Sequence, residues 1–412
     1  MTDIRNQTCC IVDNGLFVHL AQSLAGSFKR VFYYSSWETP FPRSNALLIG
    51  EGIPGVQRIN SIWPLIDDID LFVFPDILHG PLQVYLRKIG KRVWGSGLGQ
   101  ELELSRALSK KWLRDLGMKV GPHRRLVGMS ELREHLQGHD DQYVKVSRVR
   151  GDMETFHAAN YRLIEPRLDE LEHAFGAAKE TIEFVVESPI EADVEVGYDG
   201  FTIDGRFPSQ AFYGVEKKDS GFVGEVVPYL ELPESVREVN ASLKPLFRDL
   251  GYRGFWSSEI RVTDDSSSYL IDPCCRMASP PGELYCYLID NLAEILWFGS
   301  KGDIVEPVWK AKFGAELILK SGWAEQHWQP VDYPRELSDN VRLHYHAMIG
   351  GRSYYVPQQI EMPEIGGVVA GGDSREEAIK NVVEIAEQIE GYDIKWDASA
   401  LEEAARQMDK AA

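Results

Sequence analysis

The sequence predicts a mixed α/β fold (α/β with α+β character) divided among more than one domain. Over the first 100 residues, short apolar segments alternate with segments of helical spacing. This order is typical of a parallel sheet with helices on both faces. The chain has 412 residues, of which 44% are hydrophobic, so it is long enough to bury more than one core. A hairpin pattern between residues 254 and 276 adds antiparallel structure.

Composition excludes several classes of protein. The formal net charge of −19 argues against an extended nucleic-acid surface and against an anionic membrane. No apolar run approaches the roughly 20 residues that span a bilayer, and the sequence begins without the pattern of a secretion signal. The five cysteines form neither a disulfide framework nor a Cys-x-x-Cys metal motif. We therefore expect a reduced, cytoplasmic protein, and a homodimer is compatible with this composition.

The first 100 residues predict a parallel sheet with candidate ligand-binding residues in the loops that follow its strands. Ligands bind at the carboxyl ends of parallel strands, which favours Asp13, Asn14, Asp76 and His79. The turn after the first strand is not Gly-x-Gly-x-x-Gly, so dinucleotide binding is poorly supported. The predicted elements are strands at 9–12, 30–34, 70–74 and 92–95, and helices at 17–24 and 82–89.

A helix is predicted over 101–117, because Leu104, Leu108, Trp112 and Leu116 share one face. Its three cations lie elsewhere around the helix, where the simplest interpretation is a solvated face. They are Arg106, Lys110 and Lys111.

The next region carries candidate phosphate-binding groups. Lys145 lies inside a predicted strand between valines, and a buried lysine needs an anionic partner. The basic connection over 147–155 is suited to fold over phosphates, although it lacks the glycines of a strong phosphate loop. Further on, Asp193 and Glu195 alternate on one strand face. They are placed either to reach a ribose or metal, or simply to face water.

The hairpin over 254–276 is the feature around which we interpret the chain. It sets Glu259 beside Asp272, and Arg276 follows directly. Two adjacent carboxylates repel unless a cation lies between them, which suits magnesium carried by nucleotide phosphates. The alternative is a surface hairpin whose acids face water.

The last 100 residues predict a small α+β unit. Residues 313–319, 341–349 and 353–356 are expected to be strands, with a hairpin turn at Gly350–Gly351, and 284–298 is expected to be a helix. Ser374 to Glu377 forms a capping box that starts another helix. His344 and His346 would alternate on one strand face, where a structural role is more usual than a metal site.

Taken in order, these segments resemble the ATP-grasp superfamily, and within it the phosphoribosylamine–glycine ligases. The segments that carry the resemblance are 70–75, 93–95, 105–117 and the region from Phe313 to Gly391. The resemblance implies an amino-terminal pre-ATP-grasp domain (1–100), an ATP-grasp domain (101–309) with a lid at about 123–185, and a carboxy-terminal domain (310–412).

The resemblance also implies roles for individual residues. Nucleotide phosphates would contact Arg106 and Lys145. Adenine would be recognised along Glu187, Ser188 and Ile190, and the ribose by Asp193 or Glu195. The remaining implied residues are the metal ligands Glu259 and Asp272, with Cys274 at a ligand position, and the catalytic Arg276 and Lys217.

The departures from the family motif concern metal and substrate. Cys274 replaces an asparagine metal ligand, and a thiol is a poor ligand for Mg²⁺, so the second metal site is either lost, supplied by water, or tuned to Mn²⁺ or another metal. Two glycine-rich segments, near residues 14–17 and 219–224, are altered. The resemblance thus implies an ATP- and Mg²⁺- or Mn²⁺-dependent carboxylate–amine ligase that works through an acyl phosphate and uses other small-molecule substrates. The alternatives are an ATP-grasp enzyme with a non-amine acceptor and a catalytically lapsed nucleotide-binding regulator.

Overall fold

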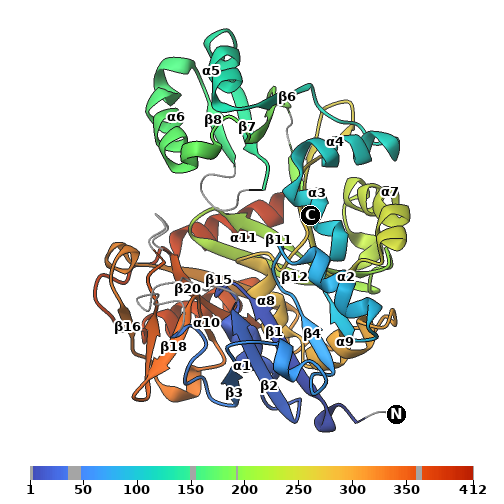
Figure 1. The fold of residues 1–412 in the computed structure, drawn as a ribbon. Helices are drawn as coiled ribbons and strands as arrows, with labels where there is room; N and C mark the ends of the chain where they lie inside the picture. The colour runs from blue at the N-terminus through green and yellow to red at the C-terminus, as the bar shows by residue number, and fades with distance from the viewer. Residues whose placement is uncertain (1–2, 36–47, 149–154, 192–193, 359–363, 412) are drawn as a thin grey trace.

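The computed structural model describes residues 3–35, 48–148, 155–191, 194–358 and 364–411. It confirms a mixed α/β architecture, with sheets of five, eight, three and four strands. Figure 1 shows the amino-terminal sheet at the base and the four-stranded unit projecting at the opposite end. No helix among the described residues is long and apolar enough to cross a membrane.

The amino-terminal sheet is parallel and confirms the predicted alternation. Its strand order is β3-β2-β1-β4-β5, and Asp13 at the end of β1 pairs in register with Ser35. All six residues of β1 are buried, as expected for a parallel strand covered on both faces. The elements are β1 (Thr8–Asp13), α1 (Val18–Leu24), β2 (Arg30–Ser35), β3 (Val56–Arg58), β4 (Leu71–Val73), α2 (Gly80–Lys88) and β5 (Arg92–Trp94).

The single helix predicted over 101–117 is wrong. The structure has a one-turn helix α3 (Glu101–Leu104) and a separate helix α4 (Arg106–Asp115). Ser105 between them has φ −107° and ψ 88°, which lie outside the helical region. The break redirects the chain so that α3 and α4 can each contact a different part of the molecule.

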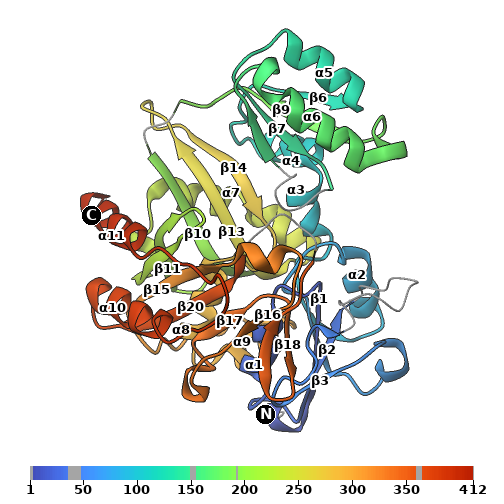
Figure 2. The ribbon, with the colours of Figure 1, turned by 90° about the vertical axis from the view of Figure 1, so that its left-hand side faces the viewer.

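The four-stranded antiparallel sheet has the order β6-β9-β7-β8 and carries two helices. Its own apolar core is formed by residues such as Leu132, Val144 and Leu171. Figure 2 shows this unit at the upper right, beside the upper part of the β13–β14 hairpin. Its elements are β6 (His123–Val127), α5 (Met129–Gln137), β7 (Gln142–Val146), β8 (Thr155–Ala158), α6 (Tyr161–Phe175) and β9 (Glu183–Glu187).

The eight-stranded sheet forms the centre of the molecule, with the order β14-β13-β10-β11-β12-β15-β20-β17. Its last three strands come from the carboxy-terminal region, so hydrogen bonding continues across residue 310. The strands are β10 (Val194–Ile203), β11 (Gln210–Lys217), β12 (Gly221–Pro228), β13 (Arg253–Val262), β14 (Ser268–Cys274), β15 (Phe313–Lys320), β17 (Val341–Leu343) and β20 (Glu364–Gly372). Helix α7 (Glu234–Leu250) precedes β13.

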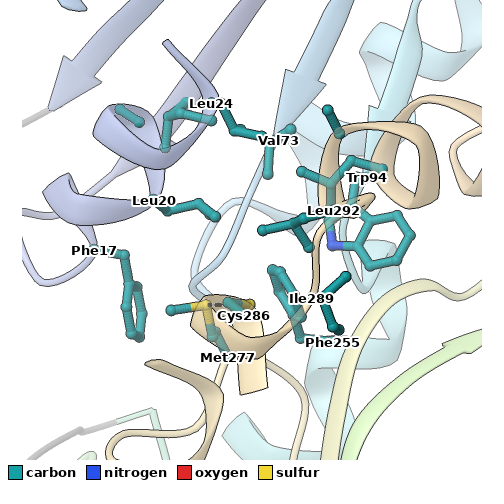
Figure 3. Packing of buried hydrophobic residues seen from close by; sticks show 14 of the residues in the cluster. Phe17, Leu20, Leu24, Val73, Trp94, Phe255, Met277, Cys286, Ile289 and Leu292 are labelled. Carbon is teal, nitrogen blue, oxygen red and sulfur yellow. Dashed lines mark hydrogen bonds between the residues drawn. The ribbon is translucent and has the colours of Figure 1, made fainter. Parts of the chain in front are cut away.

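The two faces of this sheet pack against different partners. Residues opposite each other in antiparallel strands share a face, which places Glu216, Phe222 and Glu316 on one face and Lys217, Gly221 and Leu317 on the other. The first face packs toward the amino-terminal sheet in a core that contains Phe17, Trp94, Phe255 and Met277, as Figure 3 shows. The second face is covered by α10 (Arg375–Ala386) and α11 (Ser399–Ala411).

The structure corrects two predictions, the strand at 341–349 and the helix at 284–298, and it confirms the hairpin turn at Gly350–Gly351. The segment 341–349 is not one strand, because the chain turns at Tyr345 (φ 47°) and enters β18 (His346–Ile349) of another sheet. His344 and His346 therefore do not share a strand face. The predicted helix 284–298 is α8 (Pro281–Leu288) followed by α9 (Leu292–Gly299). The Gly350–Gly351 turn joins β18 to β19 (Arg352–Tyr355), and β16 (Gln329–Val331) completes that sheet.

The predicted capping box is present at the start of α10. The Ser374 hydroxyl accepts a hydrogen bond from the backbone N–H of Glu377 at 3.1 Å. The Glu377 carboxylate accepts one from the backbone N–H of Asp373 at 2.7 Å. The first bond satisfies a backbone donor that the helix start leaves unpaired, and the second reaches the residue just before the N-cap.

We expect Leu317→Ala to destabilise the protein by about 2–5 kcal/mol, because Leu317 is fully buried between the sheet and its two covering helices. Denaturant unfolding followed by circular dichroism measures this. Leu230→Ala is the control, since Leu230 is 77% exposed, and a comparable loss in both variants would contradict the packing described.

Candidate functional site

The hairpin β13–β14 places Glu259 directly opposite Asp272, as predicted from the sequence. The ladder register shifts immediately after Glu259, so the pair lies at a bulge, a feature common next to functional sites. Glu259 is exposed, and the side chain of Asp272 is 41% exposed. Solvent therefore reaches both carboxylates.

The electrostatics of the two acids differ. Desolvation by the surrounding protein and the neighbouring Asp272 raise the pKa of Glu259 to about 8. Desolvation would also raise the pKa of Asp272, but Arg106 and Lys145 outweigh it and hold that pKa below its usual value. Near neutral pH the proton of the pair therefore resides on Glu259, and the pair carries about one negative charge.

Two other parts of the chain bring cations to this hairpin. Arg106, at the start of α4, donates from Nη1 to Asp272 Oδ1 at 2.9 Å. Lys145, from β7, donates from Nζ to the backbone carbonyl of Ile271 at 2.5 Å. The structure thus brings together the four predicted residues Arg106, Lys145, Glu259 and Asp272.

The interpretation of the α4 cations as a solvated face is wrong for two of the three. Arg106 and Lys110 are buried, and only Lys111 is exposed. Lys110 Nζ lies 2.8 Å from Glu187 Oε1. Burial would raise the pKa of Glu187, but Lys145 and Lys110 lower it overall. The sequence signal for Lys110 is its spacing of four residues from Arg106, which places both on one helix face.

The segment expected to recognise adenine and ribose makes contacts within the protein. The backbone N–H of Ser188 donates to the carbonyl of Pro122 at 3.1 Å. The carbonyl of Ile190 accepts from Arg261 Nη1 at 3.1 Å, and Arg261 Nε donates to Glu195 at 3.2 Å. Asp193 lies outside the described residues.

Lys217 is not brought to the acid pair. It lies on the face of the sheet covered by α11, where its Nζ is 3.0 Å from Glu403 Oε1. Its neighbour Glu216 lies on the opposite face, which it shares with Glu259. Burial, together with Asp199 and other acids, raises the pKa of Glu216 to about 7. Strand alternation thus makes Glu216, which sequence reasoning missed, the closer neighbour of the pair.

The chain after Asp272 holds the remaining predicted residues. Cys274 is in β14, and burial raises the pKa of its thiol well above the ordinary value. It is therefore a protonated thiol near neutral pH. Arg276 donates from Nε to Glu103 Oε1 at 2.9 Å, and Glu103 is a second residue that sequence reasoning missed. The sequence placed Glu103 within a helix without indicating its partner.

The amino-terminal turn uses Asp13 to hold its own backbone. Asp13 Oδ2 accepts hydrogen bonds from the N–H groups of Gly15 and Phe17 and from the hydroxyl of Tyr33. Burial, and to a lesser extent Asp76, raise the pKa of Asp13 to about 6. The contacts identify Asp13 as the organiser of this turn.

Among the described residues, no group of three or more His, Cys, Asp and Glu side chains is arranged to hold a metal ion. Two pockets, one lined by Tyr287, Lys310 and Asp373 and the other by Tyr198, Phe212 and Trp309, include none of the predicted site residues. The candidate site at Glu259 and Asp272 is therefore defined by its charges rather than by an enclosed volume.

Comparison with known proteins establishes the fold. No protein-family model matches the chain, and no curated protein matches it at a significant level. Among solved structures, the chain is similar to phosphoribosylamine–glycine ligase from Thermotoga maritima (TM-score 0.70, 15% identity, covering 94% of this chain and 98% of that one). It is also similar to biotin carboxylase from Campylobacter jejuni (TM-score 0.60, 13% identity, covering 95% of this chain and 94% of that one).

A third similar structure is the biotin carboxylase domain of 2-oxoglutarate carboxylase from Hydrogenobacter thermophilus (TM-score 0.64, 11% identity, covering 94% of this chain and 91% of that one). That domain is described as a dimer in complex with MgADP, ADP and bicarbonate. These are ATP-grasp proteins, and the similarity extends over nearly the whole of each chain. The protein therefore has the ATP-grasp fold.

We expect Asp272→Asn to lower the pKa of Glu259, because it removes the charge that faces this carboxylate. A ¹³C NMR titration of labelled glutamate carboxyl groups, with a chelator present, measures the shift. Asp265→Asn, a change on the exposed turn of the same hairpin, serves as the control. An unchanged Glu259 pKa in Asp272→Asn would show that the two groups do not interact.

Proposed function

We propose that this protein is an ATP-dependent carboxylate–amine ligase that releases ADP. The observation that carries the proposal is the arrangement of charges at one end of the β13–β14 hairpin. Glu259 and Asp272 face each other there, and Arg106 and Lys145 reach the same strand end from two other elements. Such a set of charges suits a nucleotide polyphosphate together with its cation.

The residues present fit a divalent cation in part. Mg²⁺ in nucleotide sites is usually bound by one or two carboxylates plus phosphate oxygens, and Glu259 and Asp272 supply two carboxylates that solvent reaches. Cys274 does not fit, because a protonated thiol is a poor ligand for a hard cation. When bound, the cation would neutralise charge on the phosphates. The proposed site thus needs Glu259 and Asp272 and does not use Cys274.

The cations would bind and orient ATP. Arg106 presents a planar fork of donors at the start of α4, and Lys145 presents a point charge from β7. Arg106 and Lys145 already contact the hairpin, so phosphates that bind beside Glu259 and Asp272 would meet donors held in place. Lys110, paired with Glu187, keeps a buried positive charge next to Lys145, which adds to the local attraction for anions.

The proposed reaction has two steps. A substrate carboxylate oxygen attacks the γ-phosphorus of ATP, the bond to the β-phosphate oxygen breaks, and ADP leaves. An amine then attacks the acyl carbon, inorganic phosphate leaves with the C–O bonding pair, and the nitrogen loses a proton. Arg276 would hold the substrate carboxylate by charge-assisted hydrogen bonds. The four-stranded unit β6-β9-β7-β8, which lies beside the β13–β14 hairpin, would exclude water from the acyl phosphate.

The similar solved structures support this class of reaction without naming substrates. One is a phosphoribosylamine–glycine ligase by name, and another carries MgADP and bicarbonate. The position of Lys217 under α11 leaves it no part in the proposed chemistry. Cys274 is the observation that favours the alternative of a nucleotide-binding protein without turnover.

We expect ATP with Mg²⁺ to be converted to ADP only when a suitable carboxylate and amine are both supplied. A panel of amino acids and amines, with ADP measured by a coupled assay, tests this. Asp272→Ala should abolish turnover, and Lys111→Ala on the exposed face of α4 should retain it. Release of ADP without an amine would identify a different acceptor, and ATP binding without turnover across the panel would contradict the ligase.

We expect Cys274→Asn to tighten Mg²⁺ binding in the presence of ATP, by about tenfold, because an amide oxygen is a better ligand for Mg²⁺ than a thiol. Titration calorimetry with a non-hydrolysable ATP analogue measures the affinity. The comparison is Cys275→Ser at the next position. Cys275 is buried in the apolar cluster that contains Tyr252 and Trp256. Weaker binding in Cys274→Asn would show that the native thiol contributes to the site.

A further inference from the structure

Glu103 is a buried carboxylate held entirely by the segment that follows the acid pair. It lies in the one-turn helix α3 and is 3% exposed. Its Oε1 accepts from Arg276 Nε at 2.9 Å, and its Oε2 accepts from the backbone N–H of Cys275 at 2.6 Å. A buried charge is stable only when it is paired and hydrogen-bonded. Each oxygen of Glu103 accepts a hydrogen bond, one from Arg276 and the other from the adjacent Cys275.

This contact fixes one edge of the Arg276 guanidinium. An arginine side chain has many rotamers, and holding it in one of them costs entropy unless a partner is already in place. Glu103 binds the Nε edge and also binds the backbone one residue earlier. The direction in which Arg276 points is thereby coupled to the position of the chain that leaves Asp272.

The same short stretch also holds the acid pair. Arg106, three residues after Glu103, donates to Asp272, and the carbonyl of Leu104 accepts from the backbone N–H of Arg148, just after β7. The break at Ser105 allows Glu103 and Arg106 to reach two points on the chain four residues apart, Arg276 and Asp272. Residues 103–106 therefore join the hairpin end to the strand that carries Lys145.

We infer that Glu103 is a positioning residue for the proposed ligase: it orients Arg276 toward the substrate carboxylate, and its effect on turnover passes through Arg276. This inference rests on the proposed function. The alternative is that the Glu103–Arg276 pair only stabilises the fold. The two differ in kinetics, because loss of a positioning contact lowers kcat of the folded protein, whereas loss of a purely structural pair lowers stability and leaves kcat of the folded protein unchanged.

A double-mutant cycle on the full-length protein distinguishes them. Glu103→Gln should lower kcat about 10- to 100-fold in the amine-dependent ADP assay, and it should change KM for ATP less than about twofold. In an Arg276→Lys background, which lacks the Nε donor, the same change should lower kcat less than about twofold. Glu101→Gln is the matched control, since Glu101 is on the same turn and pairs with Arg148 instead.

An equal loss of kcat in both backgrounds, or no loss in either, would overturn the inference. If Glu103→Gln does not fold, as judged by circular dichroism, Glu103→Asp replaces it. That variant keeps the charge, and it should lose kcat only in the Arg276 background. Absence of turnover in the wild-type protein would instead refute the proposed ligase. That result differs from every outcome of the cycle, because each of those requires an active wild-type protein.

Discussion

The opposition of Glu259 and Asp272 sets the conditions that the rest of the site must meet. Two carboxylates on neighbouring strands repel each other, and here the repulsion is reduced by a proton on Glu259 and by cations from outside the hairpin. Arg106 and Lys145 come from α4 and β7, which are far from the hairpin in sequence. The acid pair thus requires three parts of the chain to meet at one place, and the fold provides that meeting point.

The site is locally positive at one end although the protein as a whole is strongly acidic. Burial, and the charges of the nearby Lys145 and Arg106, lower the pKa of Lys110, and Glu187 offsets part of this positive charge. A local concentration of cations attracts polyphosphates, while the acidic remainder of the surface repels other polyanions. The overall charge of −19 and a nucleotide site are therefore compatible.

The sequence was informative where structure depends on near neighbours. The β13–β14 hairpin, the strand around Lys145 and the capping box of α10 follow from local patterns, and the structure confirms each. Where distant contacts decide, the sequence misled. The burial of Lys110 depends on Glu187, and the break at Ser105 accompanies contacts of α3 with Arg276. The face occupied by Lys217 depends on the register of β11 within a sheet completed by later strands. Resemblance to a family supplied the fold, and it assigned Lys217 without reference to that face.

The continuity of the eight-stranded sheet limits how the chain can be divided. Strand β12 pairs with β15 across the boundary that the resemblance placed at residue 310, and β15 in turn pairs with β20. A fragment that ended at that boundary would expose the backbone N–H and C=O groups along β12, and unpaired strand edges recruit other chains. It would also uncover apolar side chains such as Val223. The carboxy-terminal region is therefore no detachable module: expression of the preceding residues alone should yield aggregates, and fusion or circular permutation should be designed around intact β12–β15 pairing.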